Sequence, residues 1–258
     1  MDGRQMMRGA IRALVACTCA AGLLAAAGQA AHADGAGAVR ALGSDAPLGT
    51  ERLSDERAIT RYANAVELAP VRSRPSRSAP RVARLRYQTE DGPLETYLAL
   101  ESRVDARDRT WIHIRIPGRP NGRTGWVDRD ALGPLFEVTT MLRVDRHALR
   151  ATLYKAGRRI WTSRIGIGKP QTPTPAGHFW VRSRLKAFGG SAYGPWAFGT
   201  AAYSRLSDWP GGGVIGIHGT NEPRLIPGRP SHGCIRVPND KIRALARLMP
   251  VGTPVEIL

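Results

Sequence analysis

Residues 214–237 read VIGIHGTNEPRLIPGRPSHGCIRV and combine an apolar segment, a histidine and a cysteine in a short stretch. The apolar residues alternate up to His218 and predict a strand that ends there, where Gly219 allows a turn. Sixteen residues later Cys234 follows Gly233, which can adopt a positive φ and place the cysteine on a sharp bend. The loop between them can fold back, so we expect His218 and Cys234 to lie within hydrogen-bond reach.

The N-terminus has the layout of a secretory signal segment. Three arginines precede an uncharged apolar run over residues 13–27, and AHA at residues 31–33 is a small-x-small cleavage pattern. We therefore expect residues 1–33 to be a signal peptide and the protein to be exported, to the cell wall, the periplasm or the extracellular face. An uncleaved membrane anchor is the alternative, because the uncharged stretch over residues 13–33 approaches spanning length. A lipoprotein box ending at Cys17 fits less well, because only four apolar residues separate Cys17 from Arg12.

Two of the three cysteines, Cys17 and Cys19, lie inside this segment. If it is removed, Cys234 is the only cysteine and no intramolecular disulfide forms. A leftover cysteine in an exported protein indicates an intermolecular bridge or a reactive thiol, whereas a buried inert cysteine is the structural alternative. The histidine and glycines around Cys234 favour the reactive thiol.

The formal net charge is +17, and arginine contributes most of it. A field of this size attracts polyanions. The chain contains no nucleic-acid-binding motif, so anionic wall polymers or a membrane surface are the expected partners, the membrane only if the signal segment stays uncleaved. Six arginines and no acidic residue lie in residues 71–86, which form either a polyanion-binding edge or a solvated strand face.

The remaining chain divides into three parts. Residues 34–58 are rich in Gly and Ala and then charged, which predicts a flexible tether. Residues 59–135 predict short strands and turns: in RTWIHIRI, residues 109–116, three isoleucines share one face, and Asn121-Gly122 marks a hairpin. The VRSRP, WIHI and GWV segments resemble a bacterial SH3-like module.

Residues 136–258 predict a second, mainly β unit. Asn239 is positioned to cap a short helix over DKIRALARLM, in which Ile242, Leu245 and Leu248 or Met249 share one face. One amphipathic helix among many short strands favours a sandwich or barrel with a helix packed on it. The aromatic residues between residues 188 and 209 form either part of the core or a loop over the substrate.

A nucleophilic thiol needs a base, because an unperturbed thiol with a pKa near ~8.5 is mostly protonated at neutral pH. His218 is the candidate base, and a backbone carbonyl, with Gly219 the best candidate, is expected to orient its Nδ1. The amides of Gly233 and Cys234 are candidates for an oxyanion hole. A zinc site made of His218, His232 and Cys234 is the competing hypothesis. It lacks both a paired-ligand motif and a fourth ligand, so we expect no metal and no cofactor.

The stretch IHGTNEPRLIPGRPSHGCIRV, together with TPTPAGHFWV at residues 172–181, resembles the L,D-transpeptidase family with its YkuD-type catalytic domain. The resemblance covers residues 136–258. It implies a mainly β fold, in which an SH3-like small barrel is followed by a YkuD-type β-sandwich with one or two short helices.

The resemblance implies that Cys234 forms a thioester with the third residue of a peptidoglycan stem peptide and that a second stem then accepts the acyl group in a 3→3 cross-link. His218 acts as base and then acid, and carbapenems acylate the cysteine. Ser231, His232 and Arg236 shape the site, with Ser231 fixing the turn and Arg236 either holding the loop or meeting a substrate carboxylate. Two alternatives remain: an L,D-carboxypeptidase or endopeptidase that uses water as acceptor, and a non-catalytic wall-binding protein.

Overall fold

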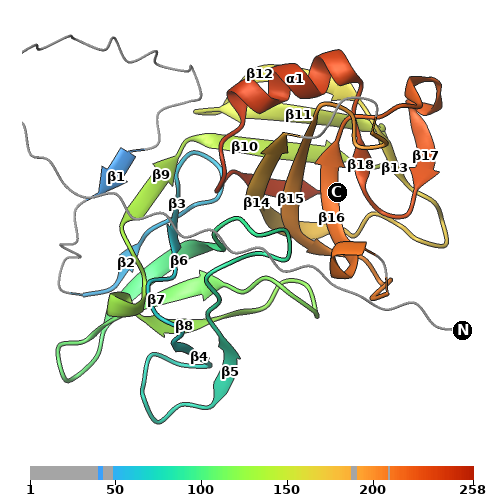
Figure 1. Ribbon diagram of the computed structural model, residues 1–258. Coiled ribbons are helices and arrows are strands. Elements are labelled where there is room, and N and C mark those ends of the chain that lie inside the picture. The colour runs from blue at the N-terminus through green and yellow to red at the C-terminus, as the bar shows by residue number, and fades with distance from the viewer. Residues whose placement is uncertain (1–39, 43–48, 187–190, 209) are drawn as a thin grey trace, which may run out of the picture. The chain divides into compact units, whose positions relative to one another are not determined.

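The N-terminal half of the chain builds an extended antiparallel sheet (Figure 1). The computed structural model describes residues 40–42, 49–186, 191–208 and 210–258, which fall within one compact unit. Within them the first sheet has nine strands in the order β1-β9-β3-β6-β7-β8-β4-β5, with β2 paired to β6. The strands are β1 (Arg40–Leu42), β2 (Glu51–Arg52), β3 (Thr60–Asn64), β4 (Pro70–Arg72), β5 (Arg81–Arg84), β6 (Thr96–Val104), β7 (Thr110–Arg115), β8 (Thr124–Asp128) and β9 (Leu135–Val138), and a 3₁₀ turn, η1 (Arg129–Ala131), precedes β9.

The alternating pattern of β7 explains how this sheet forms its core. Ile112 and Ile114 are fully buried, and Trp111 on the other face is also covered. β7 and β8 form a hairpin whose turn contains Gly122 at φ 84°, a conformation that favours glycine. On the outer face the His113 ring stacks on Trp126 with centroids 4.7 Å apart. The strand and hairpin expected here are confirmed, whereas the assignment of this sheet as SH3-like stays a prediction.

Two boundaries expected from the sequence are corrected by the strand pairing. The tether was expected to run to residue 58, but β2 pairs with β6 and Leu53 is buried. Asp55 then accepts three backbone hydrogen bonds, from residues 57, 58 and 59. A strand of two residues is too short to show an alternating pattern, so β2 could not be predicted from the sequence. The second unit was expected from residue 136, but β9 pairs with β1 and β3 and belongs to the first sheet.

The C-terminal half of the described chain forms a ten-stranded sheet in the order β12-β11-β10-β19-β14-β15-β16-β18-β13-β17. Its strands are β10 (Thr140–Asp145), β11 (Arg150–Lys155), β12 (Arg158–Arg164), β13 (Gly166–Gly168), β14 (Gly177–Lys186), β15 (Trp196–Tyr203), β16 (Val214–His218), β17 (Gly228–Ser231), β18 (Ile235–Arg236) and β19 (Pro254–Ile257). Two 3₁₀ turns, η2 (Pro210–Gly213) and η3 (Pro223–Leu225), and one α-helix, α1 (Asn239–Leu248), complete this half. The expected mainly β fold with a short helix is confirmed.

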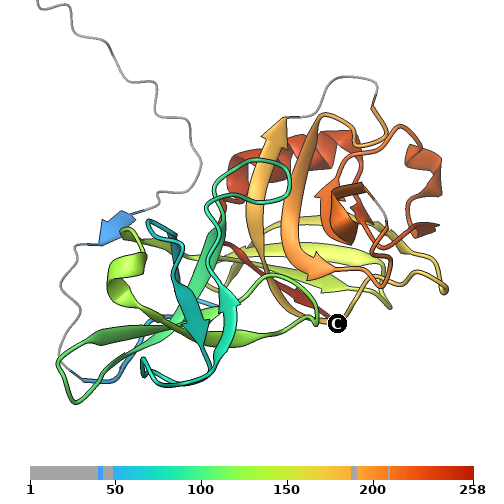
Figure 2. The same cartoon turned by 60° about the horizontal axis from the view of Figure 1, so that its bottom comes forward.

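The helix α1 packs its apolar face into the core of this sheet (Figures 1 and 2). Ile242, Leu245 and Met249 are fully buried, as the periodicity predicts. Trp161 on β12 and Arg184 on β14 donate hydrogen bonds to carbonyls of the helix. The expected cap is wrong: Pro238 is the N-cap, and no side chain caps the helix. Of the aromatic residues between residues 188 and 209, Phe198 and Tyr203 are buried in β15 and belong to the core. Trp209 lies outside the described residues.

Polar contacts join the two sheets. Arg182 on β14 donates hydrogen bonds to Glu95, which precedes β6, to Glu90 and to the Tyr203 hydroxyl. Arg86 pairs with both carboxylates. We call Arg86, Glu90, Glu95, Arg182 and Tyr203 the ionic cluster. Beyond it, Asn121 and Arg119 on the β7–β8 turn bond to the backbone at Tyr203–Leu206.

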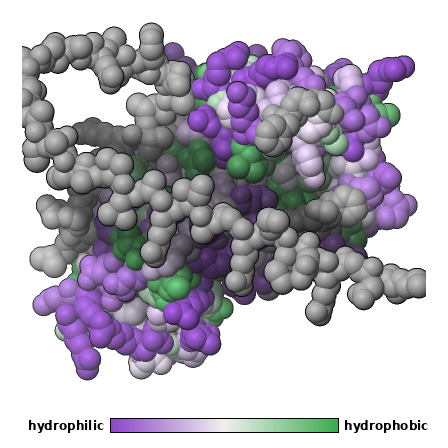
Figure 3. Space-filling view, in the orientation of Figure 1, coloured by the Kyte–Doolittle hydropathy of each residue, from purple (hydrophilic) through white to green (hydrophobic). Residues whose placement is uncertain are grey.

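Apolar side chains are concentrated in two clusters of buried residues, and the larger cluster joins Tyr62, Leu98 and Val138 of the first sheet to the core of the second. The face shown in Figure 3 is mostly hydrophilic where described residues are visible, with several separate hydrophobic patches. The described part of the chain contains no helix with the length and apolar character needed to cross a bilayer. The expected signal peptide, residues 1–33, lies outside the described residues.

Candidate active site

Parallel pairing of β16 with β18 brings the histidine and the cysteine together. Ile217 lies opposite Ile235 and His218 opposite Arg236, so Cys234 lies just before β18, at the level of Gly216. The Gly216 amide donates a hydrogen bond to Cys234 Sγ at 3.4 Å. A Cβ at Gly216 would lie 3.6 Å from His218 Cδ2 and 3.9 Å from Cys234 Sγ. Both side chains therefore border the same glycine, and we call them the His–Cys pair.

The His218 ring contacts a backbone carbonyl and an aromatic ring. Its Nδ1 lies 2.6 Å from the carbonyl oxygen of Gly219, the partner named from the sequence. Because a carbonyl only accepts, Nδ1 carries the proton and Nε2 is left as the basic nitrogen. Tyr193, half exposed, lies edge-on to the imidazole with ring centroids 4.9 Å apart. The tautomer that this arrangement selects is the one a general base needs.

Burial keeps both members of the His–Cys pair neutral. Loss of solvent lowers the pKa of His218 to about 4, with Arg236 acting in the same direction and the Gly219 carbonyl opposing it. Burial raises the pKa of the Cys234 thiol, against the Gly216 amide and the charge of Arg236. At neutral pH the resting pair is therefore imidazole and thiol, not imidazolium and thiolate.

A set of internal hydrogen bonds fixes the bend before Cys234. Ser231 Oγ donates to the Cys234 carbonyl at 2.6 Å and accepts from the Gly233 amide at 3.1 Å. Gly233 has φ 125°, and a Cβ there would lie 2.6 Å from Ile215 Cδ1, so both conformation and space require glycine. The expected oxyanion hole is corrected on this point: the Gly233 amide is already bonded to Ser231. Thr174 closes the turn by donating to the Gly233 carbonyl at 2.7 Å.

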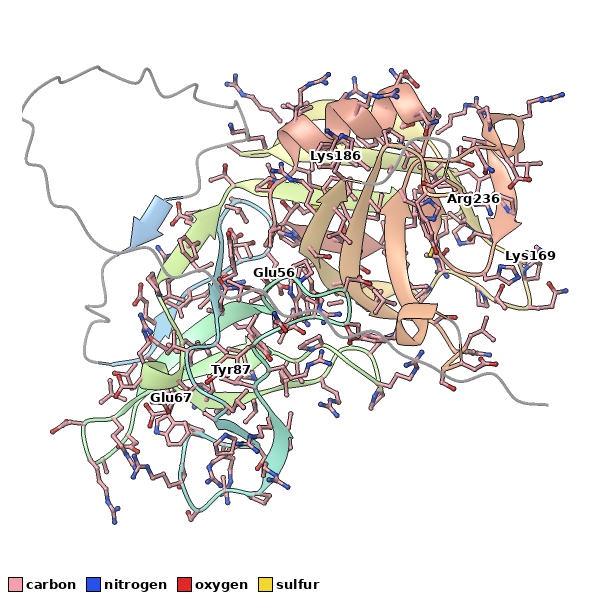
Figure 4. All side chains as sticks on the ribbon, viewed as in Figure 1. Glu56, Glu67, Tyr87, Lys169, Lys186 and Arg236 are labelled. Carbon is pink, nitrogen blue, oxygen red and sulfur yellow. The ribbon has the colours of Figure 1, made fainter. Side chains whose placement is uncertain are left out.

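The other residues singled out from the sequence lie around this bend. Arg236 Nη1 bonds to Glu222 Oε2 at 2.7 Å, so it holds the loop that follows His218. Its Nε is buried with no hydrogen-bond acceptor among the described residues. Figure 4 shows Arg236 on the side of the sheet where β16, β17 and β18 lie. The His232 side chain is exposed, next to the buried Ser231.

Sequence reasoning gave no definite site role to three residues that contact this region. Asn239 was interpreted as a helix cap, yet its side chain bonds to both backbone groups of Thr220. Thr174 lies in the TPTPAG segment, which the family resemblance did mark, and its contact with Gly233 explains why a hydroxyl is needed there. Tyr193 was one of the aromatic residues of ambiguous role.

A metal site does not form from these side chains. Over the described ranges of the chain, no group of three His, Cys, Asp or Glu residues is close enough to hold a metal ion. The three ligands of the zinc hypothesis therefore do not assemble in the structure.

Comparisons with known proteins identify relatives of the C-terminal half of the chain. The family model of the YkuD L,D-transpeptidase catalytic domain matches residues 139–257. A Bacillus licheniformis protein named as the L,D-transpeptidase YkuD is 39% identical over 105 residues, which cover 41% of this chain and 57% of that protein. The Bacillus subtilis protein of the same name is 35% identical over 122 residues, covering 47% of this chain and 68% of that protein.

Among solved structures, a mutant Enterococcus faecium L,D-transpeptidase matches with 29% identity and a TM-score of 0.38, over 46% of this chain and 49% of that one. The chain thus spans between half and about two thirds of the length of these relatives. The extent of the Bacillus subtilis match and the family model lead to one conclusion: the chain belongs to the L,D-transpeptidase family, with the YkuD-type catalytic domain at residues 139–257.

Proposed function

We propose that this protein is a cysteine acyltransferase that makes 3→3 cross-links between peptidoglycan stem peptides during cell wall biogenesis. One observation carries the proposal: the Gly219 carbonyl holds His218 in the Nδ1–H tautomer beside the glycine that also contacts Cys234 Sγ. A partly buried thiol next to a correctly oriented neutral base is the arrangement that nucleophilic acyl transfer requires. Family membership supports the same reaction class.

In the first half-reaction Cys234 Sγ attacks the carbonyl carbon of the third residue in a donor tetrapeptide. The thiol proton passes to His218 Nε2 as the S–C bond forms, because a resting thiolate is disfavoured by burial. The amide C–N bond then breaks, and the imidazolium returns the proton to the leaving D-alanine amine. A thioester on Cys234 remains.

The second half-reaction reverses these steps with a new nucleophile. The side-chain amine of a second stem attacks the thioester carbon and loses its proton to His218 Nε2. The C–S bond breaks, the sulfur regains the proton, and one amide has replaced another. For the oxyanion formed in both steps, the Cys234 amide is the remaining candidate donor once the Gly233 amide is assigned to Ser231.

The same proposal covers the setting of the enzyme. The signal-like N-terminus supports export, and the net charge of +17 supports attraction to anionic wall polymers. We assign residues 59–135, which supply most strands of the nine-stranded sheet, as an SH3-like module on their VRSRP, WIHI and GWV segments. The exposed arginines of the β4–β5 hairpin, among them Arg74, Arg77 and Arg81, are its candidate contact with a polyanion.

Incubation with a disaccharide-tetrapeptide tests the proposed function directly. Mass spectrometry is expected to detect a thioester adduct on Cys234, released D-alanine and cross-linked dimers. Tripeptide without dimers would mean that water is the acceptor and that the protein is a carboxypeptidase. No adduct and no product would leave a non-catalytic wall-binding protein.

A carbapenem provides a second probe of the same thiol. Its strained lactam carbonyl replaces the donor amide, so we expect one covalent adduct whose mass shift maps to the peptide containing Cys234. Cys234→Ala is the control and should remain unmodified. An adduct on another residue, or none on the wild-type protein, would contradict the assignment of the nucleophile.

A further inference from the structure

The peptide group between Gly219 and Thr220 is held at both of its polar ends. Its carbonyl oxygen lies 2.6 Å from His218 Nδ1, and its N–H donates to Asn239 Oδ1 at 2.9 Å. In a planar trans peptide the C=O and N–H bonds point in opposite directions. Whatever fixes the N–H therefore also aims the carbonyl, so that Asn239 and His218 are connected through a single rigid group.

The Asn239 side chain has little freedom of its own. Besides accepting from the Thr220 amide, its Nδ2 donates to the Thr220 carbonyl at 2.9 Å, so the side-chain amide grips one residue with two bonds. Asn239 is the first residue of α1, whose apolar face is buried in the core. On its other side it is in close contact with glycines: a Cβ at Gly194 or Gly219 would collide with its Oδ1.

This connection also affects the electrostatics of the base. A peptide N–H that donates a hydrogen bond polarises its own C=O, which then becomes a better acceptor. Burial lowers the pKa of His218, and the Gly219 carbonyl is the group that opposes this effect. A free peptide group would rotate and would hydrogen-bond less strongly to Nδ1.

We propose that Asn239 is a positioning residue of the active site, which holds the Gly219 carbonyl on His218 Nδ1 through one peptide group. The role rests on the proposed acyl transfer, in which His218 is the base. Asn239 thus performs, through the backbone, the task that the carboxylate of a Ser-His-Asp triad performs directly. It belongs to α1, the helix that follows the loop carrying Cys234.

The test compares two substitutions that separate the two hydrogen bonds of Asn239. Asn239→Ala removes both, whereas Asn239→Asp keeps an acceptor for the Thr220 amide and loses only the donor. Asp240→Asn, an exposed change in the same helical turn, is the matched control. Thermal unfolding establishes that each variant is folded. If Asn239→Ala is not, Asn239→Asp still tests the role, because a mixture of tautomers in this variant, which keeps the acceptor for the Thr220 amide, would contradict it.

The primary measurement is the tautomer of His218, read from the ¹⁵N shifts of its imidazole without any substrate. We expect the Nδ1–H form in the wild type, in Asp240→Asn and in Asn239→Asp, and a mixture of tautomers in Asn239→Ala. Thioester formation by Asn239→Ala should fall by roughly 10–100-fold, by analogy with the loss when a metal-bound histidine is deprived of its outer hydrogen-bond partner, and the loss should be concentrated in kcat.

The outcomes separate this inference from the proposed function. An unchanged tautomer in Asn239→Ala, or an equal loss in Asn239→Ala and Asn239→Asp, would overturn the positioning role and leave a structural one. A tautomer change without any thioester in the wild-type protein would refute the acyltransferase while leaving the positioning role intact.

Discussion

The ionic cluster and the His–Cys pair each contain buried polar side chains, but the cluster carries charges whereas the pair is neutral. In the cluster, Arg182 is 2% exposed and Glu95 0% exposed, yet each is in direct contact with an opposite charge. Burial opposes the ionisation of Glu90, but the Tyr203 hydroxyl and the charges of Arg182 and Arg86 outweigh it and lower its pKa to about 2. Glu90, Arg86 and Arg182 are therefore charged at neutral pH.

The His–Cys pair has no such partner. The Gly219 carbonyl and the Gly216 amide, both neutral backbone groups, are the hydrogen-bond partners of His218 and Cys234 among the described residues. Desolvation then prevails, and both side chains are neutral. Burial alone thus does not determine the charge state of a polar group. A buried group with an oppositely charged partner stays ionised and stabilises the fold. A buried group whose partners are neutral stays uncharged and can exchange a proton.

The largest expected effect is the loss of the thiol itself. Cys234→Ala should abolish acyl-enzyme formation and leave the ionic cluster and the fold intact, because only the nucleophile is removed. Mass spectrometry of the adduct and thermal unfolding measure the two sides of this prediction. D-alanine release at the wild-type rate by this variant would show that the nucleophile lies elsewhere.

Removal of the base comes next. His218→Ala should slow thioester formation at neutral pH by ~10²–10⁴-fold, the usual contribution of a general base. Part of the rate should return as the pH rises, because the thiol then ionises without help, and burial places this recovery above the ordinary thiol pKa. The rate of thioester formation is measured as a function of pH.

His232→Lys is the matched control for that variant, since it changes the neighbouring histidine to another basic side chain. We expect it to retain a measurable part of the activity, because His232 is exposed beside the bend. A dead His232→Lys together with a nearly normal His218→Ala would reverse the roles of the two histidines.

Substitutions in the ionic cluster should change the free energy of unfolding rather than the rate of thioester formation. Arg182→Met leaves the fully buried Glu95 without its main partner and should destabilise the fold by about 3–5 kcal/mol. Denaturant unfolding measures this. The double variant Arg182→Met, Glu95→Gln removes both charges and should recover much of the loss, and an equally unstable double variant would mean that shape, not charge, matters at this position.

The smallest expected effects concern the stability of the fold at acidic pH. The pKa of His218 is lowered by folding from 6.5 to about 4, so the unfolded chain binds the extra proton and stability falls as the pH drops from 6.5 to 4. The pKa of Glu90 is lowered from 4.5 to about 2, so its contribution is present above pH 4.5 and is lost as the pH falls towards 2. His218→Gln should flatten the stability profile in the first window and Glu90→Gln in the second. Identical profiles for the two variants would remove the distinction between the two sites.

Local patterns in the sequence carried a large part of this structure. The alternation around Ile112 and Ile114 predicted a strand, and the spacing of Ile242 and Leu245 predicted the buried face of the helix. The His-Gly and Ser-His-Gly-Cys motifs indicated the candidate site, and the glycine before Cys234 predicted the positive φ found there. These features depend on the period of a strand or a helix, or on the conformations open to one residue, so they are encoded within a few neighbouring positions.

Other features depended on which distant groups the fold brings together. The sequence alone suggests that the Gly233 amide is available to a substrate, but in the structure it donates a hydrogen bond to Ser231 Oγ. Asn239 is of a residue type that often caps helices, but the packing of α1 places its side-chain amide against Thr220, nineteen residues earlier. Arg182 and Glu95 are 87 residues apart, and nothing local to either indicates a buried pair. The residue types and their spacing therefore determined the chemistry available to this protein. Only the tertiary structure decided which polar groups remain charged and which stay neutral, because desolvation and hydrogen bonding depend on neighbours that the chain order does not specify.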